Sequence, residues 1–216
     1  PYIGKTNLDL TKEKFYEIIL EYMEKYVQTE AGKAQVISTL DTDEEKILQM
    51  EKYITAEHAK ANVILSLSTD RAKIIAMDKH ITNLRGITNI IESLESDNNK
   101  VMAMNRYIAD ERLKAYVVKS IKDDAYKLEV MSQNIQMQDN KVQIIQSIQD
   151  DNMKIYALED LLKTQQLSQQ IIQNVILTLQ SDDKKLQVMS QYIEDEQIKT
   201  NIVCSLQSDE RKMDII

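Results

Sequence analysis

Apolar residues return along this chain with a long fixed period, and within each period they have the spacing of a helix face. Counting from a recurrent Asp as repeat position 0, position 4 is apolar, position 7 is Met or Leu, and position 11 is Ile or Leu. Steps of three and four residues place side chains on one face of an α-helix. The pattern therefore predicts a first amphipathic helix in every repeat, as in Ile47, Met50 and Ile54.

A second apolar stripe occupies positions 20, 21 and 24, as in Val63, Ile64 and Leu67. Short polar stretches such as "TAEHAK" and "EDEQIK" separate the two stripes and suit a tight turn. Each repeat is therefore predicted to be a hairpin of two helices, each of about 11 to 13 residues. Because one hairpin cannot bury both of its stripes, we expect the hairpins to stack on one another.

The period itself sets the domain organisation. The recurrent Asp stands at Asp43, Asp70, Asp97, Asp124, Asp151, Asp182 and Asp209, in steps of 27 residues with one step of 31. The predicted fold is all-α, a right-handed α-solenoid of about seven two-helix repeats. We expect a single array over residues 1–216, with a degenerate repeat at 10–35 and regular repeats over 36–216. The last repeat stops after its first helix, so we expect a fragment of a longer protein.

Two polar positions recur at the start of the first helix. Position −1 is always Ser, Thr or Asp, whose side-chain oxygens accept the free amides of a helix start, and position 0 places an acid at the positive end of the helix dipole. Position 3 is always Lys, as in Lys46 and Lys73. A Lys in the first turn opposes the dipole, so we expect it to bridge to the Asp of an adjacent repeat or to the carbonyls that end the preceding helix. Seven equivalent copies do not form one active site, which favours a structural role.

The composition narrows the class of protein. Only 3 Gly and 1 Pro, with 29% charged residues, suit long helical stretches. A net charge of −8 disfavours general binding to nucleic acid. One Cys, Cys204, and two separated His, His58 and His80, predict no metal and no cofactor, and the Met residues at position 7 are assigned to the core. The sequence contains no apolar run of about 20 residues, so we expect no membrane insertion and a cytoplasmic protein.

The pairing of an acid and a base at a helix start, as in Asp43 and Lys46, resembles the HEAT-type α-solenoid repeats, whose shortest forms are close to 27 residues. The Pro common in longer HEAT repeats is missing here. The resemblance implies a scaffold whose long surface holds a partner protein or an extended peptide. The richness in Ile, Asn, Gln and Lys resembles repeat segments of secreted effectors of intracellular bacteria, which would place the protein in a host cytoplasm.

A polar row on the second helix is the leading candidate for a binding site. Position 19 holds mostly amides and position 23 holds Ser or Thr, one helical turn apart. An amide offers both a donor and an acceptor to a peptide backbone, and the related armadillo repeats carry a comparable Asn ladder. The predicted partner-binding amides, called the amide row below, are Asn62, Asn89, Gln143, Asn174 and Asn201. The alternative is that these amides bond one another or the hydroxyls of the next repeat.

Position 10 supplies a second set of candidates. It carries Tyr53, His80, Tyr107 and Tyr192 beside the apolar stripe. An aromatic ring with one polar edge is a common interface anchor, and we include these four residues among the candidate partner contacts. The alternative is that the rings pack between repeats.

The fifth repeat is four residues longer than the others. Because four residues are close to one helical turn, one or both of its helices can extend without turning their apolar faces. Its glutamines, Gln165, Gln166, Gln169 and Gln170, would then project from the array and offer a place for function. A tolerated surface insertion is the alternative.

The combined prediction is a protein-interaction scaffold without catalytic activity of its own. No Gly-rich phosphate loop and no set of nucleophile and base occurs in the sequence. One alternative is a repeat array that reads nucleic acid, which would show steep weakening of binding with salt. Another is an array that supports an enzyme domain in a further part of the same chain.

Overall fold

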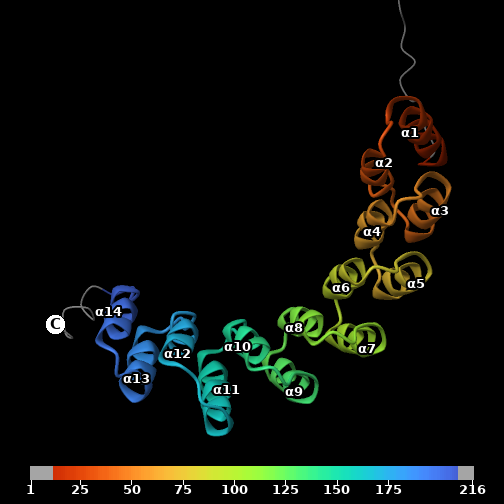
Figure 1. Cartoon of the computed structure of the whole chain (residues 1–216). Helices are drawn as coiled ribbons and strands as arrows, with labels where there is room; N and C mark the ends of the chain where they lie inside the picture. Colours follow the sequence, from red (N-terminus) through yellow and green to blue (C-terminus); the bar gives the residue numbers. More distant parts are fainter. Residues whose placement is uncertain (1–11, 209–216) are drawn as a thin grey trace, which may run out of the picture. The chain divides into compact units, whose positions relative to one another are not determined.

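The computed structural model describes residues 12–208 and contains fourteen α-helices in this range, arranged in pairs (Figure 1). The first helices of the pairs are α1 (Lys12–Tyr26), α3 (Asp43–Tyr53), α5 (Asp70–His80), α7 (Asp97–Tyr107), α9 (Asp124–Asn134), α11 (Asp151–Thr164) and α13 (Asp182–Tyr192). The second helices are α2 (Glu30–Ile37), α4 (Glu57–Leu65), α6 (Leu84–Glu92), α8 (Glu111–Lys119), α10 (Gln138–Gln146), α12 (Gln169–Ile176) and α14 (Glu196–Cys204). The predicted all-α fold of seven hairpins is confirmed. Asp209 and the first helix predicted after it lie outside the described residues.

The chain divides into two compact units, residues 1–99 and residues 100–216, with the division in the first turn of α7. In the first unit α4 packs between α2 and α6, and in the second unit α8, α10, α12 and α14 pack in that order. Five of the second helices, α2, α4, α8, α10 and α12, also contact the first helix that follows them in the chain. Each unit is thus a stack of hairpins.

The predicted helix caps are present at the start of the first helices. The Thr42 side chain accepts a hydrogen bond from the Glu45 N–H at 3.2 Å, and Asp123 accepts one from the Tyr126 N–H at 2.7 Å. The predicted lengths hold only in part, because α4 has 9 residues and α12 has 8. Except in the fifth repeat, the first helix ends at position 10, and in α3 the next residue, Ile54, has extended backbone angles and a buried side chain. The apolar residue at position 11 therefore turns the chain rather than extending the helix.

The buried face of the first helix is rotated from the predicted one. Position 7 is buried as predicted, as at Met50, whereas position 4 is only half-buried, as at Ile47. Position 6 is buried instead, as at Ala76 and Val130, because this side of the helix faces the neighbouring helices of the stack. The second stripe is confirmed at positions 20, 21 and 24, where Val63 is fully buried and the equivalent residues of most other repeats are buried too.

The Lys at position 3 is buried and holds its own hairpin closed. Six of these residues, Lys46, Lys73, Lys100, Lys127, Lys154 and Lys185, are between 2% and 7% exposed. Each ammonium donates a hydrogen bond to a backbone carbonyl at the end of the second helix, for example from Lys46 to Ser66 at 2.8 Å and from Lys73 to Ser93 at 2.9 Å. The predicted acceptor was wrong, because the carbonyl ends the helix that follows the Lys and not the preceding one. In the hairpin, that helix ends beside the start of the first, so its negative end faces the ammonium.

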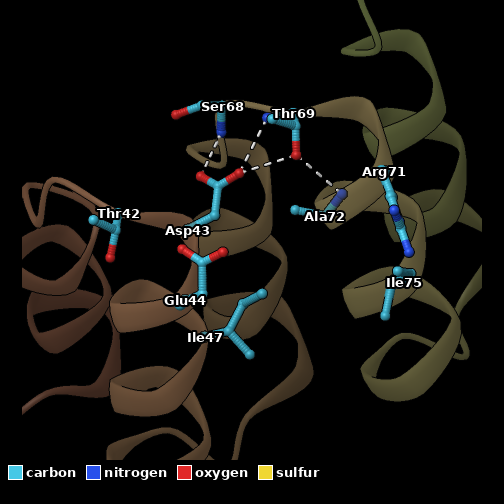
Figure 2. Close-up of a pocket in the computed structure, with 9 residues that line it drawn as sticks. All are labelled: Thr42, Asp43, Glu44, Ile47, Ser68, Thr69, Arg71, Ala72 and Ile75. Atoms are coloured by element: carbon cyan, nitrogen blue, oxygen red, sulfur yellow. Dashed lines mark hydrogen bonds between the residues drawn. The ribbon is translucent and has the colours of Figure 1, made fainter.

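The Asp at position 0 joins each hairpin to the next. Figure 2 shows the Asp43 carboxylate accepting hydrogen bonds from the backbone N–H groups of Ser68 and Thr69, at 2.7 and 3.1 Å. Asp70, Asp124 and Asp151 make the same pair of bonds to the residues that precede the next first helix, and Asp182 makes it to Gln207 and Ser208. Burial raises the pKa of Asp43, but the N–H donors of Ser68 and Thr69 lower it more, so the pKa lies below its ordinary value. The expected bridge between this Asp and the Lys of an adjacent repeat is therefore replaced by hydrogen bonds from the backbone N–H groups before the next first helix.

Candidate functional site

The amide row lies on the exposed faces of the second helices. Asn62 and Asn89 are exposed on α4 and α6 in the first unit, and Gln143, Asn174 and Asn201 are exposed on α10, α12 and α14 in the second unit. The two positions that follow in the sequence, 20 and 21, turn toward the core, as Val63 and Ile64 do on α4. Position 19 is therefore directed away from the core, and each unit presents its own row of amides to solvent.

The hydroxyl groups at position 23 do not bond the amides. The Ser66 hydroxyl donates to the Val63 carbonyl at 2.7 Å, and the Ser147 hydroxyl donates to the Ile144 carbonyl at 2.7 Å, each in the last turn of the helix that the Ser follows. Ser93, Ser120, Thr178 and Ser205 make the same bond. These residues therefore cap the helix end, where their carbonyls also receive the buried Lys. The proposed pairing of amides with hydroxyls of the next repeat does not occur at these six positions.

The hydrogen-bonding capacity of the amides is largely unused. Asn174 and Asn201 each accept one bond from a glutamine of the same helix, at 3.3 and 3.4 Å. Among the described residues, Asn62, Asn89 and Gln143 have no side-chain hydrogen-bond partner. A row of exposed amides with free donors and acceptors can bind the backbone of another polypeptide.

Three of the four candidate aromatic residues at position 10 bond to the hairpin before their own. The Tyr53 hydroxyl donates to the Glu24 carboxylate on α1, and His80 pairs with Glu51 on α3 at 3.0 Å. In the second unit the Tyr192 hydroxyl donates to Glu159 on α11 at 3.4 Å, and Tyr107 is half-buried on α7. Three of the four candidates therefore connect to the hairpin before their own, which favours the role of packing rings over that of partner anchors.

A second joint between hairpins, which the sequence analysis missed, begins at position 14. The Glu57 carboxylate accepts hydrogen bonds from the N–H groups of Thr82 and Asn83 in the turn of the next hairpin, the latter at 2.7 Å. The backbone donors of Asn83 and Thr82 lower the pKa of Glu57 to about 2. Glu30, Glu111 and Gln169 make equivalent bonds. The signal in the sequence was the recurrence of Glu or Gln at position 14, with Leu84 as an exception.

A groove between α8 and α10 lies on the amide face of the second unit. Its lining includes the exposed side chains of Arg112, Tyr116, Met137 and Gln143, together with Asp139. The Lys119 ammonium, also on α8, lies 5.3 Å from the centre of the Tyr116 ring. The groove thus combines a cation, an aromatic ring, a thioether and an amide of the row.

A second groove lies between the first turns of α3 and α5 (Figure 2). Glu44 and Arg71 are exposed on its two sides, and Ile47 and Ile75 supply its apolar surface. The carboxylate of Asp43 is already occupied by the backbone of the next hairpin. The groove contains none of the predicted partner-binding residues, so it is a cleft beside a structural joint.

The additional residues of the fifth repeat lengthen its first helix. Helix α11 has 14 residues where α9 has 11, whereas α12 is no longer than the other second helices. Gln166 and Gln170 are exposed as expected. Gln169 instead accepts hydrogen bonds from the N–H groups of Glu194 and Asp195, so it belongs to the joint with the next hairpin.

Within residues 12–208 no group of three or more His, Cys, Asp or Glu side chains is placed to hold a metal ion. Cys204 is a free, exposed thiol on α14. None of the helices in this range is long and apolar enough to cross a membrane.

The comparisons with known proteins do not assign the chain to a family. No model of a known protein family matches the sequence, and no curated protein matches it.

Proposed function

We propose that the protein is an interaction module that binds an extended segment of a partner protein across the second helices of its second unit. The observation that carries this proposal is the row of exposed amides, Gln143, Asn174 and Asn201, on three consecutive second helices. HEAT-type arrays, which the sequence resembles, bind partners on such faces. The role proposed is binding rather than catalysis.

The spacing of the helices favours one conformation of the bound segment. Helices that pack directly lie about 8 to 10 Å apart. Two residues of a β-strand span only about 6.6 Å, whereas one turn of polyproline II, with three residues, advances about 9.3 Å. A polyproline II segment would therefore offer one equivalent backbone carbonyl to each helix of the row.

The groove between α8 and α10 supplies specificity to this surface. Tyr116 stands at position 19, in line with the amide row, and polyproline II segments dock against aromatic side chains. Arg112 forms no ion pair with any residue that the structure describes, so its guanidinium can receive an acidic side chain of the partner. We infer a Pro-containing segment with an acidic residue at this point.

The experiment is a selection of displayed 12-residue peptides on the full chain, followed by affinity measurements on variants. The triple variant Gln143→Ala, Asn174→Ala and Asn201→Ala is compared with a control in which Asn152 and Gln187, exposed amides of the first helices α11 and α13, are changed to Ala. We expect the triple variant to bind selected peptides at least about tenfold more weakly, because each lost hydrogen bond contributes about 0.5 to 1.5 kcal/mol. The control keeps its affinity.

Two outcomes would refute the proposal. One is equal loss of affinity in the triple variant and the control, since the row would then have no special role. The other is a steep fall of affinity for single-stranded nucleic acid with salt in the native chain, together with no peptide binding, which would indicate phosphate contacts.

A further inference from the structure

The groove between α8 and α10 carries an unpaired charge of opposite sign on each of its two walls. Arg112 is the second residue of α8 and Asp139 is the second residue of α10, and both side chains are exposed. Neither side chain forms an ion pair with any residue that the structure describes, although both line the same groove. Two free charges of opposite sign in one groove are complementary to a ligand that carries both signs.

A hydrogen-bonded joint fixes the backbone beneath these two charges. Glu111, the residue before Arg112, accepts hydrogen bonds from the Met137 N–H at 2.7 Å and from the Asn140 side chain at 3.1 Å. Asp139 lies between Met137 and Asn140 in the sequence. The Glu111 carboxylate is thereby bound to α10 and does not pair with Arg112. The joint therefore holds the two charged residues at a fixed separation across the groove.

Position 15 carries a charge only in this groove among the second helices of the second unit. Arg112 and Asp139 occupy this position on α8 and α10, whereas Gln170 and Gln197 are the equivalent residues on α12 and α14. The amide row cannot define the direction of a bound segment, because each amide is both a donor and an acceptor. Two unlike charges at one end of the row can define it.

The distance between the two walls sets the spacing of the charges that they bind. Helices α8 and α10 pack directly against each other, and helices in direct contact lie about 8 to 10 Å apart. One turn of polyproline II advances about 9.3 Å and returns to the same face after three residues. Residues on one face of a β-strand are only about 6.6 Å apart. Two charged side chains three positions apart in a polyproline II segment therefore match Arg112 and Asp139.

We propose that Arg112 and Asp139 select a partner segment in which an acidic and a basic residue stand three positions apart. This inference rests on the proposed binding of an extended segment. The Arg112 guanidinium donates to the acidic residue, and the Asp139 carboxylate accepts from the basic one. In the opposite direction the same segment would bring like charges together on both walls. The two residues thus fix the direction in which the segment crosses the second unit.

The probes are polyproline peptides of 12 residues, labelled for fluorescence anisotropy, that carry one Glu and one Lys three positions apart near their middle. In one peptide Glu precedes Lys, and in the other Lys precedes Glu. The two peptides have the same composition and net charge, so they differ only in the order of the charges. A second pair of peptides separates the two charges by four positions.

The full chain is tested as the native protein and as a charge-swapped variant, Arg112→Asp with Asp139→Arg. The matched control is Asp160→Lys with Lys163→Asp, which reverses an exposed ion pair on α11 and also leaves the net charge unchanged. Circular dichroism verifies that the three proteins have the same helicity.

We expect the native chain to bind one order at least about tenfold more tightly, since the other order replaces two modest attractions with two repulsions. The charge-swapped variant prefers the opposite order, and the control keeps the native preference. The preference weakens at about 1 M salt, where exposed charges are screened. It is smaller for the peptides with four-residue spacing, because their two charged side chains no longer share one face.

Separate results distinguish this inference from the proposed function. Equal affinity for the two orders, or the same preference in the native and charge-swapped chains, would overturn the inference. If the triple variant Gln143→Ala, Asn174→Ala and Asn201→Ala still bound both peptides more weakly, the proposed function would stand. No binding of any of the peptides would overturn the polyproline II register on which the inference depends.

A last variant tests whether the bound segment belongs to the chain itself. Asp209 and Lys212 also stand three positions apart and lie outside the described residues. We expect Asp209→Asn with Lys212→Gln to leave the affinity for the favoured peptide unchanged. Tighter binding in this variant would assign the groove to these residues of the chain and not to a partner.

Discussion

The Lys73 ammonium donates a hydrogen bond of 2.9 Å to the backbone carbonyl of Ser93, twenty residues later in the sequence. This bond connects the first turn of α5 to the end of α6. The Lys73 side chain lies in the interior of the hairpin. A buried charge is tolerated only when it has partners, and here the partner is the negative end of a helix. The same bond recurs in six hairpins, so the Lys is part of the repeat's architecture.

Replacing Lys73 with Met is therefore expected to destabilise the protein by about 1 to 3 kcal/mol, because the Ser93 carbonyl loses a charged donor. Arg71→Met is the matched control, because Arg71 is exposed on the same helix and its loss changes stability by less than about 0.5 kcal/mol. Urea unfolding followed by circular dichroism measures both. Equal midpoints for the two variants would contradict the assigned role.

The Asp joint predicts a local effect on the next hairpin. Asp124→Ala removes the acceptor for the N–H groups of Gln149 and Asp150, which precede α11. We expect these two amides to exchange at least about tenfold faster, since charged hydrogen bonds contribute about 1.5 to 3 kcal/mol. Asp139→Ala, at an exposed carboxylate of α10, leaves the exchange of both amides unchanged. Unaltered exchange in Asp124→Ala would show that the joint has no energetic role.

The Glu57 joint predicts a dependence of stability on acid. Its pKa is about 2 in the folded protein, below the value of about 4.3 in an unfolded chain. Because the folded pKa is the lower one, the stabilisation is complete above pH of about 4.3 and is lost as pH falls toward 2. The carboxylates of Asp43, Asp70 and Asp124 have lowered pKa values and act in the same direction.

The test compares urea midpoints at pH 5 and pH 2.5 for the native chain and for Glu57→Gln. The amide keeps an acceptor oxygen, as Gln169 does in the fifth repeat, but it does not titrate. We expect a smaller drop of the midpoint in Glu57→Gln than in the native chain. Glu44→Gln, at an exposed carboxylate of α3, should reproduce the native drop, and an identical drop in all three proteins would exclude the joint as a source.

Two neighbouring residues at the end of α12, its last residue Ile176 and the capping residue Leu177, test the assignment of the core. Ile176 is 0% exposed in the core of the second unit, and Leu177 is 39% exposed. Ile176→Ala is expected to cost about 2 to 5 kcal/mol, because it removes buried methyl groups and leaves a cavity. Leu177→Ala is expected to cost much less. Comparable losses of unfolding free energy in the two variants would show that the face of α12 is assigned incorrectly.

The sequence was sufficient for the elements that depend on local order. The 27-residue period, the caps such as Thr42 and the stripe of Val63 and Ile64 predicted hairpins that the structure confirms. The caps and the apolar stripe depend on residues only a few positions apart. Helix geometry fixes how such residues lie relative to one another, so their spacing in the sequence is enough to predict them. The length of the second helices was overestimated. After the turn at Ile54, helix α4 begins only at Glu57, and it ends before Ser66, whose hydroxyl bonds the Val63 carbonyl of the last turn.

The tertiary structure alone decided which partners the recurrent polar residues take. Lys46 reaches a carbonyl 20 residues later, and Asp43 reaches N–H groups 25 and 26 residues later. Both distances become short only when a hairpin closes and the next one stacks on it, and no local spacing encodes them. For the same reason Asn62 could be identified as a candidate from its position in the repeat, while its exposure and its free amide became evident only after stacking had buried Val63 and Ile64.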